Sequence, residues 1–322
     1  MRYEIKPLFE SRMKELLPDS SDFMKFNEII HIGPRSFIRC NTLKISSDEL
    51  FHRLGKKWKV ERPFSHYPEI ILIKSELGPG ELGNSIEHLM GYYYVQEISS
   101  MLSVLALDPK PGELVLDVCA SPGSKTGQIA ARMENSGTLI ANDIKLDRVA
   151  ILAANLERCG VSNCIVTRMD GVGLCSRFEK NGMKFDKILL DAPCSGEGTL
   201  RSSPKTFLMW NAKMIDKFGR MQKKLLAHGL RCLKVGGTLV YSTCTHAPEE
   251  NESVIEFALK NFPVELESLS GVLPLKCRAG VKEWKGEKFS KDVEKNCCRI
   301  YPQDNDSEGF FVAKLRLREE IK

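Results

Sequence analysis

The stretch LVLDVCASPGSKTGQIA, residues 114–130, decides the fold. An apolar strand ends at Asp117, and a Pro-Gly turn leads directly into a helical pattern. A turn of this kind aims backbone N–H groups at whatever binds beside it. It is not a Walker A loop, because Ser124 stands where that pattern needs a glycine before Lys125, and it is not a G-x-G-x-x-G loop. The alternative is a tight structural turn with no ligand.

Further apolar runs follow, and most are separated by helical patterns, which indicates repeated strand-helix units. We expect strands over 114–118, 138–142, 164–168, 187–190, 238–241, 264–269 and 310–317. We expect helices over 126–133, 146–159, 213–233 and 249–261, with Gly236-Gly237 as the stop signal of the third and Pro248 in the first turn of the fourth. The pattern predicts an α/β fold with a doubly wound, Rossmann-like sheet whose last strand is antiparallel.

The first 90 residues have a different pattern. FIRCNTLKI and EIILIKS are typical of strands, and DELFHRLGKKW is typical of a short helix. We therefore expect a small α+β extension over residues 1–90 and the main domain over residues 91–322. Between residues 31 and 75 there are nine Lys or Arg against four acids. This cluster is either an ordinary solvated surface or a patch that binds phosphates.

Composition limits the class of protein. The 322 residues carry 47 Lys plus Arg and 42 Asp plus Glu, a formal charge of +5, with 42% hydrophobic residues, which argues against disorder. There is no secretory signal and no apolar run of roughly 18 residues, so we expect a soluble protein in the cytoplasm. Without a secretory signal, the 11 cysteines indicate reduced thiols rather than a disulfide framework.

Acidic residues end three further strands: Asp143, Asp170 and Asp191. In a doubly wound sheet these strand ends open onto one crevice. An acid at the end of the second strand is placed to accept hydrogen bonds from ribose hydroxyls, and Asp170 would lie beside an adenine. The pattern indicates a ligand that contains adenosine, and the missing Walker lysine argues against a triphosphate. Each aspartate has the alternative of capping a helix.

Two cysteines follow neighbouring strands, Cys194 in DAPCSGEGTL and Cys244 in LVYSTCTHAPEEN. Thiols there could form a redox pair, bind a metal or act as nucleophiles. Zinc needs four ligands at short CxxC-type spacing, which neither segment offers, so we expect no metal. The remaining cysteines have no such framework; we interpret six as packing or surface residues, namely Cys40, Cys159, Cys164, Cys175, Cys232 and Cys277.

Taken together, DVCASPGSKT, DAPCSGEGTLR and VYSTCTHAPEENE resemble the cofactor loop and the two cysteine motifs of the Sun-type RNA (cytosine-5) methyltransferases. FIRCNTLK and GYYYVQEISSM are similar to two upstream segments of that family, so the resemblance extends from about Arg35 to the closing GFFVAKLR. The departures are small. Ser121, Ser124 and Thr245 replace the alanine, glycine and serine that are common in the family, and none removes a reactive group.

The resemblance implies S-adenosylmethionine as cofactor and Cys244 as the nucleophile that adds to carbon 6 of cytosine, which makes carbon 5 reactive. It gives Cys194 a part in product release and lets Asp191 hydrogen-bond the ring nitrogen 3 and the amine of the base. Asp117 would support the cofactor loop, and Lys125 either lowers a thiol pKa or touches RNA phosphate. The cofactor residues that it implies are Cys119, Ala120, Ser121, Pro122, Gly123, Ser124, Lys125, Asp143, Arg148, Asp170 and Asp191.

We expect the partner to be RNA, and tRNA in particular because the motifs resemble archaeal tRNA enzymes. We also expect the protein to be a monomer that does not contact a membrane. The RNA would be held by the N-terminal extension and the crevice rim. Arg39, Arg201, Tyr92 and Tyr94 are the candidates for phosphate contact and stacking, with packing as the alternative for the tyrosines. Two other functions stay open: methylation of rRNA, and a non-catalytic RNA-binding or ribosome-assembly factor with the same fold.

Overall fold

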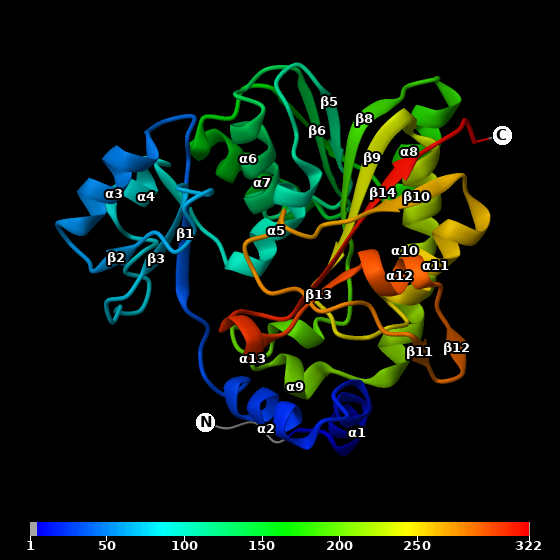
Figure 1. Ribbon diagram of the computed structural model, residues 1–322. Coiled ribbons are helices and arrows are strands. Elements are labelled where there is room, and N and C mark those ends of the chain that lie inside the picture. Colours follow the sequence, from blue (N-terminus) through cyan, green and yellow to red (C-terminus); the bar gives the residue numbers. More distant parts are fainter. Residues whose placement is uncertain (1–4, 322) are drawn as a thin grey trace.

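Two larger β-sheets and a third sheet of two short strands organise residues 5–321, the part of the chain that this computed structural model describes. Figure 1 shows a large sheet with helices on both faces and, beside it, a smaller lobe formed by the early part of the chain. No helix in the described range is long and apolar enough to cross a membrane.

The large sheet has the strand order β10-β14-β9-β8-β5-β6-β7, and β13 also pairs with β14. The five strands from β9 to β7 are parallel, whereas β14 runs antiparallel to both of its neighbours. The predicted doubly wound fold with an antiparallel last strand is confirmed, although β14 lies inside the sheet and β10 forms its edge. The strands are β5 Leu114–Asp117, β6 Thr138–Asp143, β7 Cys164–Arg168, β8 Phe185–Asp191, β9 Leu233–Thr243, β10 Val264–Glu267, β13 Cys298–Ile300 and β14 Phe310–Leu317.

Alternate residues of these strands supply two separate cores, as the period of a β-strand requires. One core contains Val115 and Leu189 and packs against α5 Ile98–Leu107 and α6 Ser124–Arg132. The other contains Leu116 and Leu190 and packs against α8 Gly171–Lys180, α10 Ala212–Arg231 and α11 Glu252–Asn261. Helix α7 Leu146–Cys159 covers β6 and β7. Helices on both faces leave the C-terminal strand ends as the place for a site.

The small lobe is an antiparallel sheet of order β2-β3-β1-β4. Its elements are β1 Ser36–Cys40, α3 Ser47–Gly55, β2 Val60–Glu61, β3 Ile70–Ile73, α4 Ile86–Leu89 and β4 Tyr93–Val95. The small N-terminal α+β unit is thus present, while the proposed domain boundary at residue 90 stays a prediction.

Two helices that the sequence did not predict precede the small lobe, α1 Pro7–Leu16 and α2 Ser20–Ile29. Figure 1 shows them below the large body, away from the small sheet. Their apolar residues share a core with residues far along the chain, such as Phe207, Trp210 and Tyr301. The remaining elements are η1 Glu197–Thr199, α9 Thr206–Met209, β11 Glu283–Trp284, β12 Glu287–Lys288, α12 Lys291–Asn296 and α13 Pro302–Asn305.

Three local expectations are wrong. Helix α10 ends at Arg231 and β9 begins at Leu233, so the Gly236-Gly237 pair lies within a strand and stops no helix. A Cβ on Gly237 would lie 2.8 Å from the carbonyl oxygen of Lys234, so this tight bend explains the glycine. Helix α11 begins at Glu252 and not at 249. Cys277, interpreted as a bystander with a reduced thiol, forms a disulfide with Cys298.

Candidate functional site

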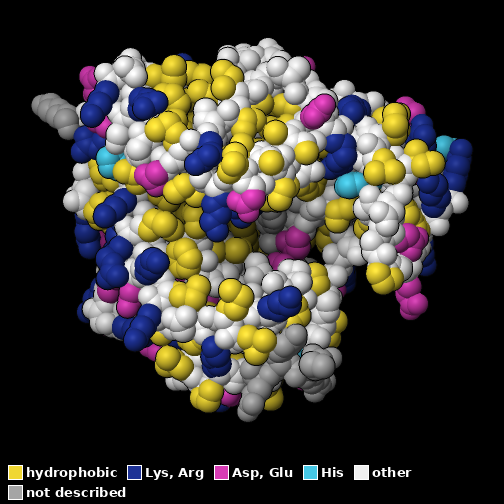
Figure 2. Space-filling view, turned by 180° about the vertical axis from the view of Figure 1, so that it is seen from behind, with side chains coloured by type: hydrophobic (Ala, Val, Ile, Leu, Met, Phe, Trp, Pro, Cys, Tyr) yellow, Lys and Arg dark blue, Asp and Glu magenta, His cyan; other side chains and the backbone are white. Residues whose placement is uncertain are grey.

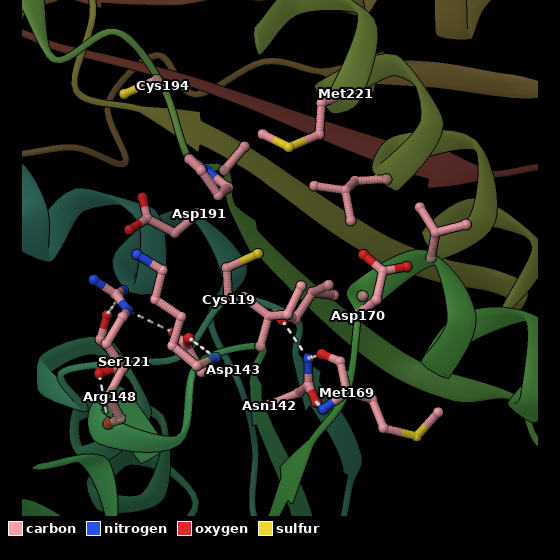
Figure 3. A pocket seen from close by; sticks show the side chains of 18 of the residues that line it. Cys119, Ser121, Asn142, Asp143, Arg148, Met169, Asp170, Asp191, Cys194 and Met221 are labelled. Carbon is pink, nitrogen blue, oxygen red and sulfur yellow. Dashed lines mark hydrogen bonds and ion pairs between the residues drawn. The ribbon is translucent and has the colours of Figure 1, made fainter. Parts of the chain in front are cut away.

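A cavity of about 530 Å³ opens at the C-terminal ends of the parallel strands. Eight of the predicted site residues line it, since strand ends at one sheet edge must converge; they are Cys119, Ser121, Asp143, Arg148, Asp170, Asp191, Cys194 and Cys244. Figure 3 shows Asp191 between Cys194 and Cys119, with Arg148 and Ser121 at one end of the cavity and Asp170 at the opposite side. Ala120, Pro122, Gly123, Ser124 and Lys125 do not line it.

The loop after β5 is held from both sides. The backbone N–H of Ala120 donates to the carbonyl of Asn142 at 2.7 Å, and the hydroxyl of Thr126 donates to Asp117 at 2.8 Å. Gly123 precedes the first residue of α6 at φ +101°, a conformation that favours glycine. Burial raises the pKa of Asp117 to about 7. Asp117 is therefore a buried support of the loop, in keeping with its expected role.

Asp143 and Arg148 form a fixed pair at the end of β6. Nε of Arg148 lies 3.0 Å from Oδ2 of Asp143, and its Nη2 donates to the carbonyl of Ser121 at 2.7 Å. The hydroxyl of Ser121 in turn donates to the carbonyl of Arg148 at 2.8 Å. Arg148 thus orients Asp143 and ties it to the β5 loop, which leaves the carboxylate facing the cavity (Figure 3).

Asp170 has two tasks at once. Its Oδ2 accepts the N–H of Gly173 at 3.0 Å and caps α8, which was the alternative considered for such an aspartate, and it also lines the cavity. Asn142, which sequence analysis missed, binds the neighbouring loops together: its amide donates to the carbonyls of Val118 and Met169. A polar residue inside the apolar 138–142 run was the available signal.

Lys125 reaches Asp191 and not a thiol. Its Nζ lies 2.8 Å from Oδ2 of Asp191 and 2.8 Å from the hydroxyl of Ser100, while Ser242 donates to Oδ1 of Asp191 at 2.7 Å. Both carboxylate oxygens of Asp191 therefore have partners, and one of these partners is a cation. Of the two roles considered for Lys125, neither matches this contact; it positions the charge of Asp191.

The sulfur atoms of Cys194 and Cys244 lie 3.3 Å apart at the rim of the cavity. The hydrogen bond with Cys244 and burial raise the pKa of Cys194 well above that of a free thiol. A thiol beside another sulfur can donate a hydrogen bond to it, and only a thiolate is nucleophilic. The arrangement therefore allows one cysteine to act as a nucleophile and the other as its hydrogen-bond partner. No group of residues with the makings of a metal site exists between residues 5 and 321.

Residues that sequence analysis missed hold the two cysteine loops together. Glu250 Oε2 accepts the N–H of Ser195 at 3.0 Å and the amide of Gln222 at 2.9 Å, and that amide also donates to the carbonyl of Pro193 at 2.8 Å. Burial raises the pKa of Glu250 to about 7. A polar Gln222 on the buried side of α10 was the available signal for this contact. No such signal marked Glu250, because the predicted helix 249–261 includes this residue, whereas α11 begins at Glu252.

The neighbouring histidine takes no part in this chemistry. His246 stacks on Tyr301 at 5.0 Å and meets the edge of Phe26, and burial lowers its pKa to about 3. It does not line the cavity. A general base next to Cys244 is therefore not supplied by this side chain.

The residues expected to grip RNA are mostly engaged elsewhere. Arg201 is buried and donates to the carbonyls of Ile32, Gly33 and Ser307. Arg39 is buried and donates to Gln96 and to the carbonyl of Ser124. Neither arginine is free for a phosphate, so both expectations are wrong.

The tyrosines beside these arginines pack within the protein. Tyr92 lies under Arg53, and Tyr94 contacts both Arg39 and Arg158. These contacts fit the packing alternative.

Comparisons with known proteins identify relatives over most of the chain. The model of the 16S rRNA methyltransferase RsmB/F family matches residues 104–316. The model of the N-terminal domain of 16S rRNA methyltransferase RsmF matches residues 5–98. The chain is 42% identical over 301 residues to a tRNA (cytosine(49)-C(5))-methyltransferase of Pyrococcus abyssi, with 93% of each covered. It is 40% identical to Ribosomal RNA small subunit methyltransferase F of Pectobacterium carotovorum and spans 62% of that protein's length.

Solved structures of methyltransferases are similar to this chain over most of its length. A methyltransferase homologue from Pyrococcus horikoshii superimposes with a TM-score of 0.80 at 37% identity, covering 92% of this chain and 90% of that one. NSun6 from the same organism, solved with SFG, has a TM-score of 0.79 at 24% identity and covers 96% and 97%; this likeness concerns the fold alone.

Proposed function

The chain belongs to the 16S rRNA methyltransferase RsmB/F family, and from that premise we propose that it forms 5-methylcytosine in tRNA. It is an S-adenosylmethionine-dependent RNA methyltransferase, the activity that the sequence predicted. The observation that carries the chemistry is the pair of sulfur atoms 3.3 Å apart beside Asp191. A binding factor has no need of two thiols at this place.

The choice of tRNA over rRNA rests on the extent of the match. The tRNA enzyme of Pyrococcus abyssi is covered over 93% of its length, whereas the rRNA enzyme of Pectobacterium carotovorum is covered over 62%. A monomeric state and a cytoplasmic location are part of the same proposal.

The cavity suits S-adenosylmethionine. Two carboxylates, Asp143 and Asp170, face it and can accept hydrogen bonds from ribose hydroxyls and an adenine amine, while Ile144, Val172 and Leu225 offer apolar surface to a purine. When bound, the cofactor supplies a methyl group on a sulfonium. We assign its binding to the loop residues that line the cavity, Cys119 and Ser121, and to Asp143, Arg148, Asp170 and Asp191. The other predicted residues of the 119–125 loop support this binding surface from outside the cavity lining.

The chain's own residues account for activation of the base. Cys244 as thiolate adds to carbon 6 of cytosine, which places electron density on carbon 5 so that carbon 5 can take a methyl group. Asp191, held by Lys125 and Ser242, accepts a hydrogen bond from the amine of the base. Carbon 5 then gives its proton to solvent water, and the electron pair of that bond restores the double bond between carbons 5 and 6. The bond between carbon 6 and sulfur breaks, and its electron pair returns to the sulfur of Cys244. The thiol of Cys194 can donate a hydrogen bond to that sulfur as it leaves.

The test is transfer of labelled methyl from S-adenosylmethionine into unmodified tRNA and, separately, into naked rRNA, followed by bisulfite mapping. We expect label at cytosines of tRNA. Label in rRNA alone would keep the chemistry and overturn the substrate. No label in either RNA would favour the non-catalytic RNA-binding factor.

Variants of the two cysteines test their separate roles. Cys244→Ala should reduce methyl transfer below about 1% and leave cofactor binding, measured by calorimetry, unchanged. Cys194→Ala should accumulate an RNA adduct that survives denaturing gel electrophoresis and vanishes in the double variant. Cys164→Ala, on β7 and outside the cavity lining, is the control and should retain activity. Full activity of Cys244→Ala, or no adduct with Cys194→Ala under turnover, contradicts the assignment.

A further inference from the structure

Helix α10 forms one wall of the cavity and faces solvent beside it. Phe218, Met221 and Leu225 line the cavity. At about 100° per residue, these side chains point roughly a quarter turn away from the exposed side of the helix. Gln222 on the same helix donates to the carbonyl of Pro193, so α10 is joined directly to the loop that carries Cys194.

The exposed side of α10 carries a line of cations. Lys213, Lys217, Arg220 and Lys224 are all exposed, and the spacing of four, three and four residues puts them within an arc of about 60°. Each turn of the helix thus presents one cation. Asp216 is the one acid in α10, and it is exposed on the same helix.

These four cations, here called the α10 stripe, have no ion-pair partner among residues 5–321. The basic cluster of residues 31–75 is different, because most of its cations already have partners. Arg35 pairs with Asp306, Lys57 with Glu87, Arg62 with Asp48 and Lys74 with Glu61. Of the nine cations there, Lys56 and Lys59 are the exposed ones whose side chains have no partner within the described range.

Figure 2 looks onto the hollowed face of the molecule. Lys and Arg side chains gather on the large-body side of the hollow, away from the small lobe. A row of unpaired cations beside a cavity is an electrostatic footprint for a polyanion, since each cation can neutralise a phosphate and release counterions.

We propose that the α10 stripe binds successive phosphates of the substrate RNA next to the target nucleotide. This rests on the proposed function, because it takes RNA as the substrate. Phosphate contacts fix the register of a nucleic acid without reading its sequence. Held along α10, the strand flanking the target would enter beside Met221 and place one base over the cysteine pair. The stripe therefore acts on RNA affinity, and the reacting groups act on turnover.

The experiment compares three variants of the 322-residue chain with the wild type. The stripe variant is K217Q/R220Q/K224Q. The matched control is K288Q/K291Q/K295Q, which removes three exposed cations of β12 and α12 that have no ion-pair partner in the described part of the chain. The third, K56Q/K59Q, removes the unpaired cations of the small lobe. Fluorescence anisotropy with labelled tRNA at several salt concentrations gives Kd, and methyl transfer gives KM and kcat.

The stripe variant should raise Kd and KM for tRNA about tenfold or more and change kcat less than about twofold. The slope of log affinity against log salt should become shallower by about 2, as the loss of three phosphate contacts requires. The control should match the wild type. A stripe variant with the Kd and salt slope of the wild type, or a larger loss in K56Q/K59Q, overturns the proposal.

Binding separates this proposal from the proposed function. If the wild type binds RNA through the stripe but transfers no methyl group, the proposed function fails and the stripe stands. If the wild type methylates tRNA and the stripe variant is unaffected, the stripe fails and the function stands. Equal melting temperatures of all four proteins confirm that the exposed substitutions leave the fold intact.

Discussion

At the scale of single residues, the cysteine pair depends on a buried carboxyl behind it. Glu250 is fully buried, accepts from Ser195 and Gln222 with one oxygen, and has no partner for the other oxygen within residues 5–321. A buried carboxyl with a free oxygen is costly to ionise, which is the cause of its raised pKa. The loop that carries Cys194 is thus held by a group that titrates near neutrality.

This titration predicts a pH dependence of stability that Glu250→Gln removes. The pKa of Glu250 is about 7 when folded and near 4.5 when unfolded, so the folded state holds its proton longer. Its contribution to stability is fully present below pH 4.5 and is lost as the pH rises through 7, by on the order of 3 kcal/mol in total. Urea denaturation of both proteins from pH 4.5 to 8.5 measures it. A constant difference between them across this range would contradict the prediction.

The predicted site residues show which inferences a sequence supports. Asp143, Asp170 and Asp191 lie together because the strand ends of a parallel sheet share an edge, and the apolar runs that mark these strands are visible in the sequence. The contact of Lys125 with Asp191 depends on the packing of α6 against α5, which no spacing reveals. The hydrogen bond between Gln222 and Glu250 also depends on tertiary packing, so no sequence spacing reveals it.

At the scale of elements, regular strands were predictable and irregular segments were not. The ranges 164–168 and 310–317 match β7 and β14. In β14 apolar side chains fill the buried positions, whereas β7, at the edge of the sheet, has no fully buried residue. Helices α1 and α2 were not predicted because their few buried residues pack against residues 200–215 and 301, so no local sequence pattern marks these helices. Gly236 and Gly237 are strong helix-stop signals locally, yet they bend a strand.

The segment between β10 and β13 is another element without a local pattern. Its disulfide joins Cys277 to Cys298 of β13, 21 residues apart in sequence. Arg278 pairs with Asp22 of α2 and with Asp304 of α13, so this segment connects three parts of the chain.

Breaking the bridge should lower stability without reaching the cavity. Cys277→Ser frees a loop of about 20 residues in the unfolded chain, which corresponds to about 3 kcal/mol and a fall of a few degrees in melting temperature. A reductant should produce the same fall in the wild type and none in the variant. Melting curves with and without reductant test this. A wild type that ignores the reductant would show that the bridge contributes nothing.

At the scale of the whole molecule, helix α1 is bonded to the segments that follow the two cysteines. Arg12 of α1 donates two hydrogen bonds to Glu249, at 2.9 and 2.8 Å, and its Nε lies 4.0 Å from Glu197. Glu249 directly precedes Glu250, and Glu197 accepts from Thr245 and Trp210. A contact between residues more than 180 positions apart thus supports both cysteine loops.

Removing this contact should be far more costly than removing an exposed ion pair of the same helix. Arg12→Met leaves the buried Glu197 without its cation and leaves Glu249 with only the exposed Lys285, which should cost about 3 kcal/mol in urea denaturation at pH 7. Lys14→Gln removes the exposed pair with Glu10 and should cost less than about 0.5 kcal/mol.

The free energy of unfolding that Arg12→Met loses should also depend on pH, and Glu249 determines the direction of that dependence. Burial alone would raise the pKa of Glu249, but the hydrogen bonds and charge of Arg12 outweigh it and bring the pKa to about 2. A lowered carboxyl pKa gives stability that is present above the unfolded value near 4.5 and is lost as the pH falls toward 2. In Arg12→Met this carboxyl can protonate and become neutral, so the gap to the wild type should narrow as the pH falls from 7 to 3. A difference in stability that stays constant with pH, or one no larger than that of Lys14→Gln, would mean that α1 merely covers the two cysteine loops and does not hold them.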